Sequence, residues 1–291
     1  MDRLLDRDLI VVTGKGGVGT STIAAALGLL AASRGLRAIV AETGGHADSA
    51  RLLAGTGVDH VSISPRAAMD EYLHHRLPSR TLADMLSASG MFASFVTATP
   101  GMTELLTIGK AWELAQDDRR TPGARRYDVV ILDAPASGHG LAMLTAPHTF
   151  AATARVGPIH RQAGRIDASL RDPAQTAIVG VTTPEEMPVN ELLELRVAVR
   201  ESLGREVDAV IANAVAADRF SAADVRALQE AGGPAASAAL WADGRARSQR
   251  NQLRRLRGAL DEPPLRLPQL YADPLGGDEA RQLATALGKR L

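Results

Sequence analysis

The sequence predicts an α/β protein with a doubly wound, mainly parallel β-sheet and a helical insertion. Short apolar runs without polar alternation recur along the chain, as expected for parallel strands that helices cover on both faces. The first run ends in a glycine-rich turn, which opens a helix that leads to a second run. With 291 residues, of which 45% are hydrophobic, the chain suits one large domain. We therefore expect residues 1–291 to form a single domain.

The strands and helices are expected in the following order. The strand candidates are residues 9–12, 37–41, 61–63, 127–132, 177–181, 207–211 and, more weakly, 265–267. A helix of small residues over 21–30 should stop before Gly35, and an apolar stripe over 192–203 predicts a helix that ends at Gly204. Ser221 and Asp224 form a capping box that predicts a helix start, and residues 214–262 are expected to be mostly helical. A closing helix is expected over 278–291.

Residues 66–126 form the expected helical insertion. The strand signal disappears there, and apolar residues recur at helical spacing between Pro78, Pro100 and Pro122. The insertion also contains a group of methionines: Met69, Met85, Met91 and Met102. These residues fit either the core of a helical subdomain or an adaptable hydrophobic groove.

Composition excludes several function classes. The chain has no cysteine, which rules out disulfides, thiolate metal sites and cysteine nucleophiles and suits a reducing cytoplasm. The N-terminus has no apolar core of a secretory signal, and no apolar run approaches the ~20 residues of a membrane span. Because 33 basic residues balance 33 acidic ones, no global attraction to nucleic acid is expected. We expect a cytoplasmic protein with no transmembrane segment and no nucleic-acid partner.

The glycine-rich turn after the first strand predicts a phosphate site. Glycines let backbone N–H groups converge on an anion, and the following helix adds its positive N-terminal end. The Ser21 hydroxyl is placed for a magnesium ion. The expected nucleotide contacts are Gly14, Gly16, Gly17, Val18, Gly19, Thr20, Ser21 and Thr22.

The usual pattern of such a loop ends in G-K-[ST], but Thr20 stands at the lysine position. A hydroxyl can donate to a phosphate but carries no charge. The loss of one charged hydrogen bond should weaken nucleotide binding by roughly 10- to 100-fold. Hydrolysis should suffer more, because charge on the transferring phosphoryl group is stabilised electrostatically.

A second motif, D-A-P-A-S-G-H over residues 133–139, follows the strand candidate 127–132. Asp133 at the carboxyl end of that strand is well placed to hold magnesium through water. His139, the last residue of the motif, fits a structural hydrogen bond better than general-base catalysis.

With Lys15 one residue after the first glycine, the loop resembles that of the deviant-Walker ATPases. The D-x-P-x-x-G-H spelling resembles the arsenite-pump and tail-anchored-protein-targeting branch of that group. The resemblance implies ATP or ADP and Mg²⁺ as cofactors, and a catalytic Lys15 that crosses a dimer interface to the partner's nucleotide. It further implies that Gly138 senses the γ-phosphate, that Asn213 hydrogen-bonds the adenine and that Pro268 packs on the base.

More narrowly, residues 67–73, 100–106 with 109–110, and 157–160 resemble the actinobacterial anion-transporting-ATPase-like proteins that form paired subunits. Departures are found after the second strand. The branch has an aspartate in a D-P-A-H segment there, whereas residues 41–46 read A-E-T-G-G-H. Glu42 and Asp48 are the nearest carboxylates. The targeting ATPases of this branch bind zinc through a pair of cysteines in a homodimer, and the arsenite pump has a cysteine metalloid site. This chain has no cysteine and so lacks both.

Three functional hypotheses follow. The first is an ATP-binding subunit with weakened hydrolysis that acts in a homodimer or a heterodimer with a related ATPase subunit. The second is an active ATPase that escorts hydrophobic clients or membrane proteins through the helical insertion. The third is a partition-type positioning protein that binds DNA or membrane through the arginines between Arg245 and Arg257, which also fit a solvated helix face. Thr20 leaves open whether this chain hydrolyses ATP or only binds it.

Overall fold

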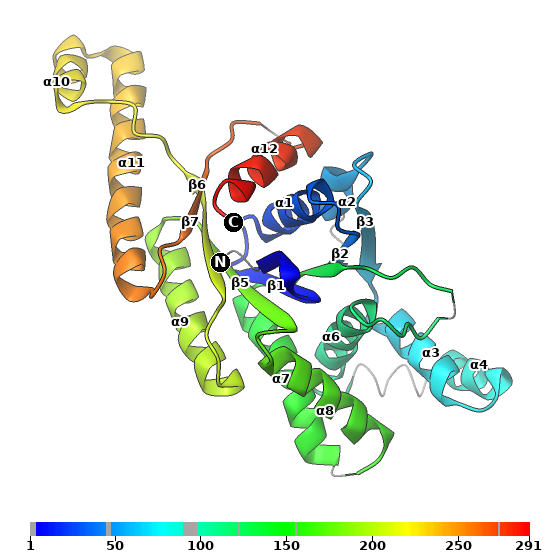
Figure 1. Ribbon diagram of the computed structural model, residues 1–291. Coiled ribbons are helices and arrows are strands. Elements are labelled where there is room, and N and C mark those ends of the chain that lie inside the picture. Colours follow the sequence, from blue (N-terminus) through cyan, green and yellow to red (C-terminus); the bar gives the residue numbers. More distant parts are fainter. Residues whose placement is uncertain (1–3, 45–47, 90–97, 122, 155, 273) are drawn as a thin grey trace.

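The computed structural model describes residues 4–44, 48–89, 98–121, 123–154, 156–272 and 274–291. Its centre is a seven-stranded sheet in the order β3-β2-β4-β1-β5-β6-β7, and each neighbouring pair is parallel (Figure 1). The strands are β1 (Leu9–Gly14), β2 (Ala38–Thr43), β3 (Asp59–Ile63), β4 (Val129–Asp133), β5 (Thr176–Thr182), β6 (Ala209–Val215) and β7 (Leu265–Pro268). The predicted parallel α/β class is confirmed.

Helices connect the strands and cover the sheet. After the short 3₁₀ helix η1 (Leu4–Asp6), they are α1 (Thr20–Ser33), α2 (Asp48–Leu53), α3 (Pro65–Arg76), α4 (Arg80–Ala88), α6 (Met102–Leu114), α7 (Ser137–Ala154), α8 (Pro158–Arg171), α9 (Glu186–Leu203), α10 (Ala222–Ala231), α11 (Gly233–Ala259) and α12 (Gly277–Gly288). Gly204 ends α9 in the left-handed conformation, and the Ser221–Asp224 capping box opens α10, as predicted. The stretch 214–262 is mostly helical, but the chain breaks at Gly232 between α10 and α11.

Two hydrophobic cores lie on opposite faces of the sheet. One contains alternate strand residues such as Ile10, Val40 and Ile131 together with α1, α2 and α12. The other contains the intervening residues, such as Val11, and the apolar sides of α6 to α9. Helices on both faces explain why the strands carry apolar residues at successive positions. Figure 1 shows α12 and α1 above the sheet and α6, α7 and α8 below it.

The segment between β3 and β4 contains α3, α4 and α6. Met69 and Met102 are buried, with 9% and 5% of their surface exposed, whereas Met85 on α4 is 68% exposed. Met91 lies outside the described residues. At the opposite edge of the sheet, α10 and α11 form an arm that extends beyond β6 and β7 (Figure 1). Within the described part of the chain, no helix combines the length and apolarity that crossing a membrane requires.

Candidate functional site

Glycines shape the turn between β1 and α1. Gly17 and Gly19 have φ values of 88° and 90°, in the left-handed region that strains any residue with a Cβ. No side chain caps the start of α1, so the N–H groups of its first turn are left for water or a ligand. The turn therefore offers unpaired amides and a positive helix end, the two features that bind an anion.

All of the predicted phosphate contacts lie in this one turn. Gly14 ends β1 so close to β5 that a Cβ would lie 2.2 Å from the carbonyl oxygen of Val181. Val18 is buried beneath the turn. The turn continues through Gly16, Gly17 and Gly19 into the first residues of α1, Thr20, Ser21 and Thr22.

Asn213 on β6, a strand separated from β1 by β5, supports the turn. Its Nδ2 atom donates to the carbonyl oxygen of Val18 at 2.9 Å, and a Cβ on Gly19 would lie 2.6 Å from the same nitrogen. This amide therefore fixes the shape of the turn between β1 and α1, residues 15–19, which we call the phosphate turn. The sequence did not indicate this role of Asn213. Its contact with an adenine base stays a prediction.

Pro268 ends β7, where it is paired with Val215 of β6, and a surface pocket lies next to this pair. A pocket of ≈ 250 Å³ is bounded there by Phe220, Trp241 and Tyr271. Tyr271 and Trp241 are 74% and 69% exposed. No sequence motif indicates Trp241 and Tyr271, and their only signal is the rarity of aromatic residues, which make up 3% of the chain.

Asp133 lies under the start of α1, at the carboxyl end of β4. It is paired in the ladder with Glu42 at the end of β2, and the two side chains are only 5% and 2% exposed. Oδ2 of Asp133 accepts from Ser49 Oγ at 3.4 Å, and Oε2 of Glu42 lies 3.1 Å from His60 Nε2. The remaining carboxylate oxygen of each residue, Asp133 Oδ1 and Glu42 Oε1, is buried without a hydrogen-bond partner.

Burial raises the pKa of Asp133 to about 6, and the charge of Glu42 acts in the same direction. The hydroxyls of Ser21, Ser49 and Thr20 oppose this shift only in part. Among the residues that the structure describes, neither of these two buried carboxylates pairs with a lysine or an arginine. Because Mg²⁺ prefers carboxylate and hydroxyl oxygens, Asp133 with its unpartnered Oδ1 and Ser21 fit a magnesium ion. Within the described ranges, no group of three or more histidine or acidic side chains forms a metal cluster.

The second predicted motif, residues 133–139, runs from the end of β4 into the start of α7. Gly138 lies in the first turn of that helix, where a Cβ would meet no other atom within 4 Å, and His139 is exposed. The preceding Ser137 hydroxyl donates to Oε1 of Glu191 on α9. Lys15 Nζ lies 2.6 Å from Oε2 of the same carboxylate, which lowers the pKa of Glu191. In this conformation Lys15, which the resemblance places across a dimer interface, is paired within its own chain.

The segment after β2 places no free carboxylate over the phosphate turn among the residues that the structure describes. Glu42 is buried beside Asp133, and Asp48 begins α2, where it pairs with Arg51 at 3.3 Å. Residues 45 and 46 of the A-E-T-G-G-H segment lie outside the described residues.

The parallel sheet and its glycine turn define an α/β protein of the P-loop NTPase class. A family model described as "Anion-transporting ATPase" matches residues 7–166, and the chain belongs to this family. The match spans β1 to α8 and so includes the phosphate turn, Asp133 and the helical segment.

The chain is also similar to individual proteins of related description. It is 32% identical over 210 residues to ATPase BagA of Mycobacterium tuberculosis, which covers 66% of this chain and 61% of that protein. It is 28% identical over 242 residues to protein SCO2128 of Streptomyces coelicolor, covering 79% of this chain and 56% of the relative. A "Putative arsenical pump-driving ATPase" of Halobacterium salinarum is 23% identical over 93% of this chain and 42% of its own length. The chain thus spans about half of these relatives, and the predicted actinobacterial resemblance is confirmed.

Proposed function

We propose that this chain is an ATP-binding subunit whose phosphate turn holds a nucleotide with Mg²⁺ and whose own hydrolysis is weak. The observation that carries this proposal is the position of Asp133, with a buried unpartnered oxygen, beneath the uncapped start of α1. Phosphate groups would accept from the N–H groups between Gly16 and Ser21. Ser21 and Asp133 would hold the magnesium ion, which supplies positive charge to the phosphates.

Two features support weakened hydrolysis. Thr20 gives the turn no ammonium group to stabilise charge on a phosphoryl group in transfer. In addition, neither carboxylate of the segment after β2 is exposed and free beside the turn, because Glu42 is buried next to His60 and Asp48 pairs with Arg51. No free carboxylate among the described residues is therefore offered to position an attacking water.

A dimer gives Lys15 its role in this proposal. The lysine pairs with Glu191 in the single chain, and its side chain is 36% exposed. Exposed ion pairs contribute only ~0.2–1 kcal/mol, so a nucleotide phosphate on a partner subunit can compete for this lysine. Both a homodimer and a heterodimer with a related ATPase subunit meet this requirement.

Calorimetric titration of ATP and ADP, with and without Mg²⁺, tests nucleotide binding. We expect binding that magnesium strengthens, and no detectable binding at millimolar nucleotide would overturn the proposal. Turnover by wild-type protein and by the Thr20→Lys variant tests the second part. The variant should bind ATP about 10- to 100-fold more tightly, as one charged hydrogen bond is regained, and should hydrolyse it faster. Equal turnover would remove the inferred defect.

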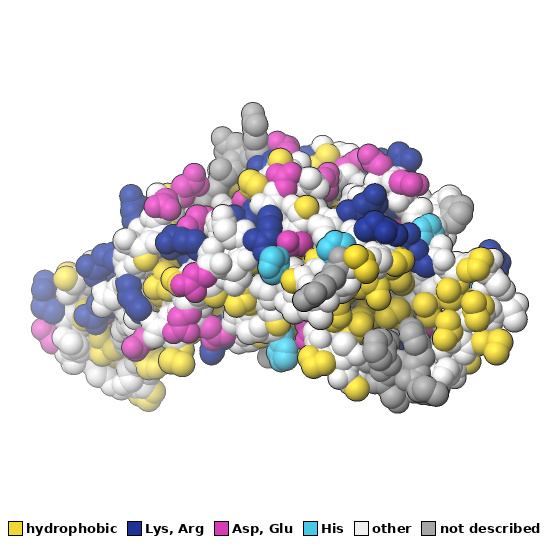
Figure 2. Space-filling view, turned by 90° about the horizontal axis from the view of Figure 1, so that it is seen from below, with side chains coloured by type: hydrophobic (Ala, Val, Ile, Leu, Met, Phe, Trp, Pro, Cys, Tyr) yellow, Lys and Arg dark blue, Asp and Glu magenta, His cyan; other side chains and the backbone are white. Residues whose placement is uncertain are grey.

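One observation favours the second hypothesis, that hydrophobic clients bind the helical segment. Leu82 and Met85 on α4 are 43% and 68% exposed, and Figure 2 shows hydrophobic side chains gathered at the end of the molecule that carries α3 and α4. Nucleotide-dependent capture of an apolar helical peptide by the wild type, lost on Leu82→Ser with Met85→Ser, would support this role. Equal capture by the wild type and the double variant would contradict it.

The DNA-binding hypothesis gains less support. Arg245, Arg247 and Arg250 pair with Glu185, Asp243 and Asp218. These pairs compensate three of the six arginines between Arg245 and Arg257, so about half of the positive charge of this helix face is already neutralised. We therefore keep the prediction that nucleic acid is not a partner, and DNA retention that falls steeply with salt would contradict it.

A further inference from the structure

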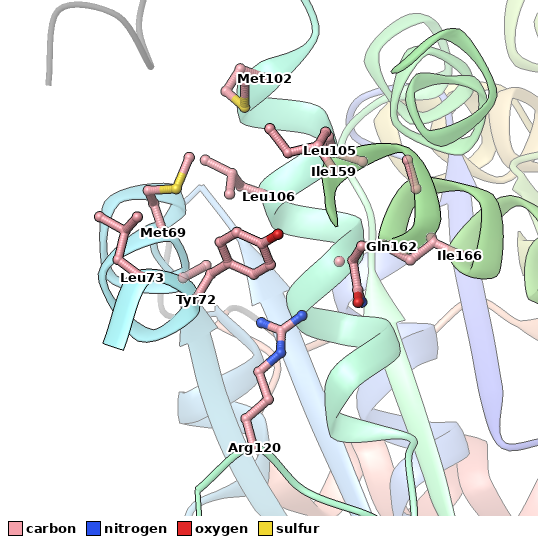
Figure 3. A pocket seen from close by; sticks show the side chains of 13 residues that line it. Met69, Tyr72, Leu73, Met102, Leu105, Leu106, Arg120, Ile159, Gln162 and Ile166 are labelled. Atoms are coloured by element: carbon pink, nitrogen blue, oxygen red, sulfur yellow. The ribbon is translucent and has the colours of Figure 1, made fainter. Parts of the chain in front are cut away.

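A pocket of ≈ 160 Å³ lies between α3, α6 and α8, and none of its lining residues belongs to the phosphate turn. Figure 3 shows side chains of Met69, Leu105, Leu106 and Ile159 facing this space. Apart from Tyr72, Gln162 and Arg120, every lining residue is apolar or glycine. An apolar pocket with few polar groups is the usual form of a small-molecule site.

Two guanidinium groups stand at the polar end of this pocket. Arg120 lies 5.5 Å and Arg76 5.8 Å from the centre of the Tyr72 ring. Arg76 Nη2 donates to Gln162 Oε1 at 3.3 Å, and Figure 3 shows the Arg120 guanidinium directed toward Tyr72. In the described part of the chain, neither arginine forms an ion pair.

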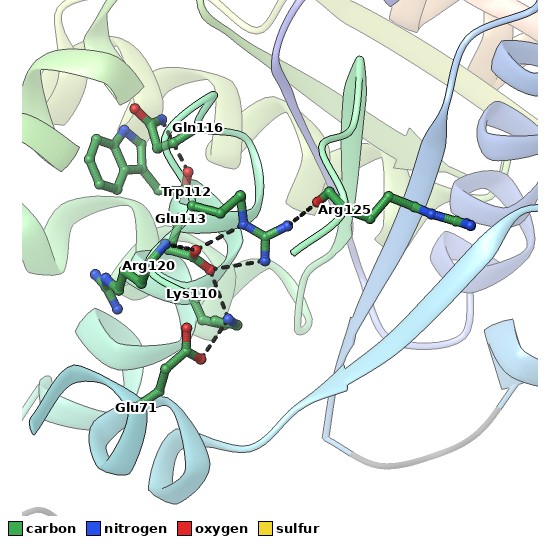
Figure 4. Close-up of polar contacts among 8 residues, drawn as sticks. Glu71, Lys110, Trp112, Glu113, Gln116, Arg120 and Arg125 are labelled. Carbon is green, nitrogen blue, oxygen red and sulfur yellow. Dashed lines mark hydrogen bonds and ion pairs between the residues drawn. The ribbon is translucent and has the colours of Figure 1, made fainter. Parts of the chain in front are cut away.

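The nearby carboxylates are already engaged by other cations. Glu113, 1% exposed, accepts from Arg119 Nε at 2.9 Å and from Lys110 Nζ at 2.7 Å. Lys110 also pairs with Glu71 at 2.6 Å, as Figure 4 shows. The carboxylates of Glu71 and Glu113 thus neutralise the charges of Lys110 and Arg119. The positive charges of Arg76 and Arg120 are not neutralised by these two carboxylates.

The surroundings of Arg120 disfavour its positive charge. Burial lowers the pKa of Arg120, and repulsion from Arg76 adds to this effect, although the carboxylates of Glu113 and Glu71 oppose it. A buried or half-buried cation is stabilised by an opposite charge within hydrogen-bonding reach. A bound anion at the polar end of the pocket would provide that charge.

We propose that this pocket binds a small carboxylic acid with a hydrocarbon chain. The carboxylate would lie against Arg120 and Arg76, where guanidinium groups match its geometry, and the chain would fill the apolar space between α6 and α8. An apolar cavity of ~150 Å³ admits a benzene molecule, so a chain of roughly six to eight carbons is the appropriate size. A helical peptide is too large, since a helix with its side chains is ~10–12 Å across.

Titration of octanoate into the purified chain without nucleotide tests this proposal, with 1-octanol as the uncharged analogue. We expect one octanoate per chain and weaker binding of octanol. Arg120→Leu should weaken octanoate binding by about 10- to 100-fold, as expected for a lost hydrogen bond to a charged group. Because no nucleotide is present, failure here is distinguishable from failure of the proposed nucleotide site.

Two further variants separate the pocket from general charge effects. Arg165→Leu removes an exposed arginine on α8 that does not line the pocket, and it should leave octanoate binding unchanged. Leu106→Trp fills the pocket and should abolish binding of both compounds while the far-UV circular dichroism stays native. Equal affinities for octanoate and octanol, equal losses in Arg120→Leu and Arg165→Leu, or no binding to the wild type would each overturn the proposal.

Discussion

Glu42 and Asp133 are direct neighbours in the β2–β4 ladder, and both are buried with one carboxylate oxygen unpartnered. Two carboxylates without a cation are unfavourable in a protein interior, because burial and like charge both oppose ionisation. No lysine or arginine in the described part of the chain pairs with either carboxylate, so their negative charge beneath the phosphate turn is not compensated there. A magnesium ion would compensate this charge, since the lysine that usually follows the glycines is Thr20 here.

Asp133→Asn should stabilise the metal-free protein at pH 7. The folded-state pKa of Asp133 is about 6, above the ordinary 3.8, so the folded state holds the proton more tightly and stability falls as pH rises between these values. At pH 7 the neutral side chain should recover up to about 3 kcal/mol. Urea unfolding in EDTA measures this gain, which should vanish near pH 4. Asp128→Asn is the matched control, because the pKa of that exposed aspartate is lowered by Arg37 and its loss should not stabilise.

Magnesium-dependent nucleotide binding should weaken as pH falls through about 6, because protons and Mg²⁺ compete for Asp133. At about pH 5.5 only a quarter of this carboxyl is ionised, which predicts roughly fourfold weaker magnesium-dependent binding. Calorimetry at pH 7.5 and 5.5, with and without Mg²⁺, measures the difference. An equal loss of binding in the Asp133→Asn variant would assign the pH effect to another group.

Glu191→Gln should release Lys15 and increase nucleotide-dependent self-association. The Lys15–Glu191 pair is partly exposed, so the free energy of unfolding should change by less than about 1 kcal/mol. Sedimentation velocity with ATP and Mg²⁺ measures the association. The gain should disappear when Lys15→Ala is added, and a gain that survives in the double variant would show that Lys15 does not reach a partner.

Gly19→Ala should be more harmful than Gly17→Ala. Both residues have positive φ, which costs ~1–2 kcal/mol for a residue with a Cβ. Only at Gly19 would the Cβ also lie 2.6 Å from Asn213 Nδ2, whereas the space around Gly17 is open. Chemical denaturation should give a larger loss for Gly19→Ala, and its nucleotide affinity should fall further. Equal effects would mean that the Asn213 contact does not support the turn.

Glu113→Gln should destabilise the helical segment between β3 and β4. Burial opposes ionisation of Glu113, but Arg119, Lys110 and the Arg120 N–H outweigh it and hold its pKa at about 2. The charged carboxylate therefore stabilises the fold above pH 4.5, and this contribution is lost as pH falls toward 2. Removing one partner of a buried pair should cost ~3–5 kcal/mol in a urea unfolding experiment. Glu206→Gln, at an exposed pair with Arg200, should cost much less.

The strands and the phosphate turn could be predicted from the sequence because their signals are local. Apolar runs such as residues 127–132 indicate strands without any knowledge of their neighbours, and glycines at positions 17 and 19 meet a backbone requirement that sequence alone reveals. The C-terminal end of α9 and the start of α10 were predicted for the same reason, since Gly204 and the Ser221–Asp224 box act within one helical turn.

The contacts between distant segments could not be predicted in this way. Asn213 reaches Val18 across 195 positions of the chain, and Lys15 reaches Glu191 across 176. Such pairs depend on the strand order and on how α9 packs over β1 and β5, which no local pattern encodes. The register that sets Glu42 beside Asp133 belongs to the same class.

The sequence by itself thus determined the parallel α/β architecture and a glycine-rich turn with Thr20 at the usual lysine position, because backbone conformation and hydrophobic periodicity are properties of short segments. Only the tertiary structure decided that two carboxylates share a buried site, that Lys15 pairs within its own chain and that Arg120 faces an apolar pocket. The physical reason is that burial and charge balance depend on every element packed around a group.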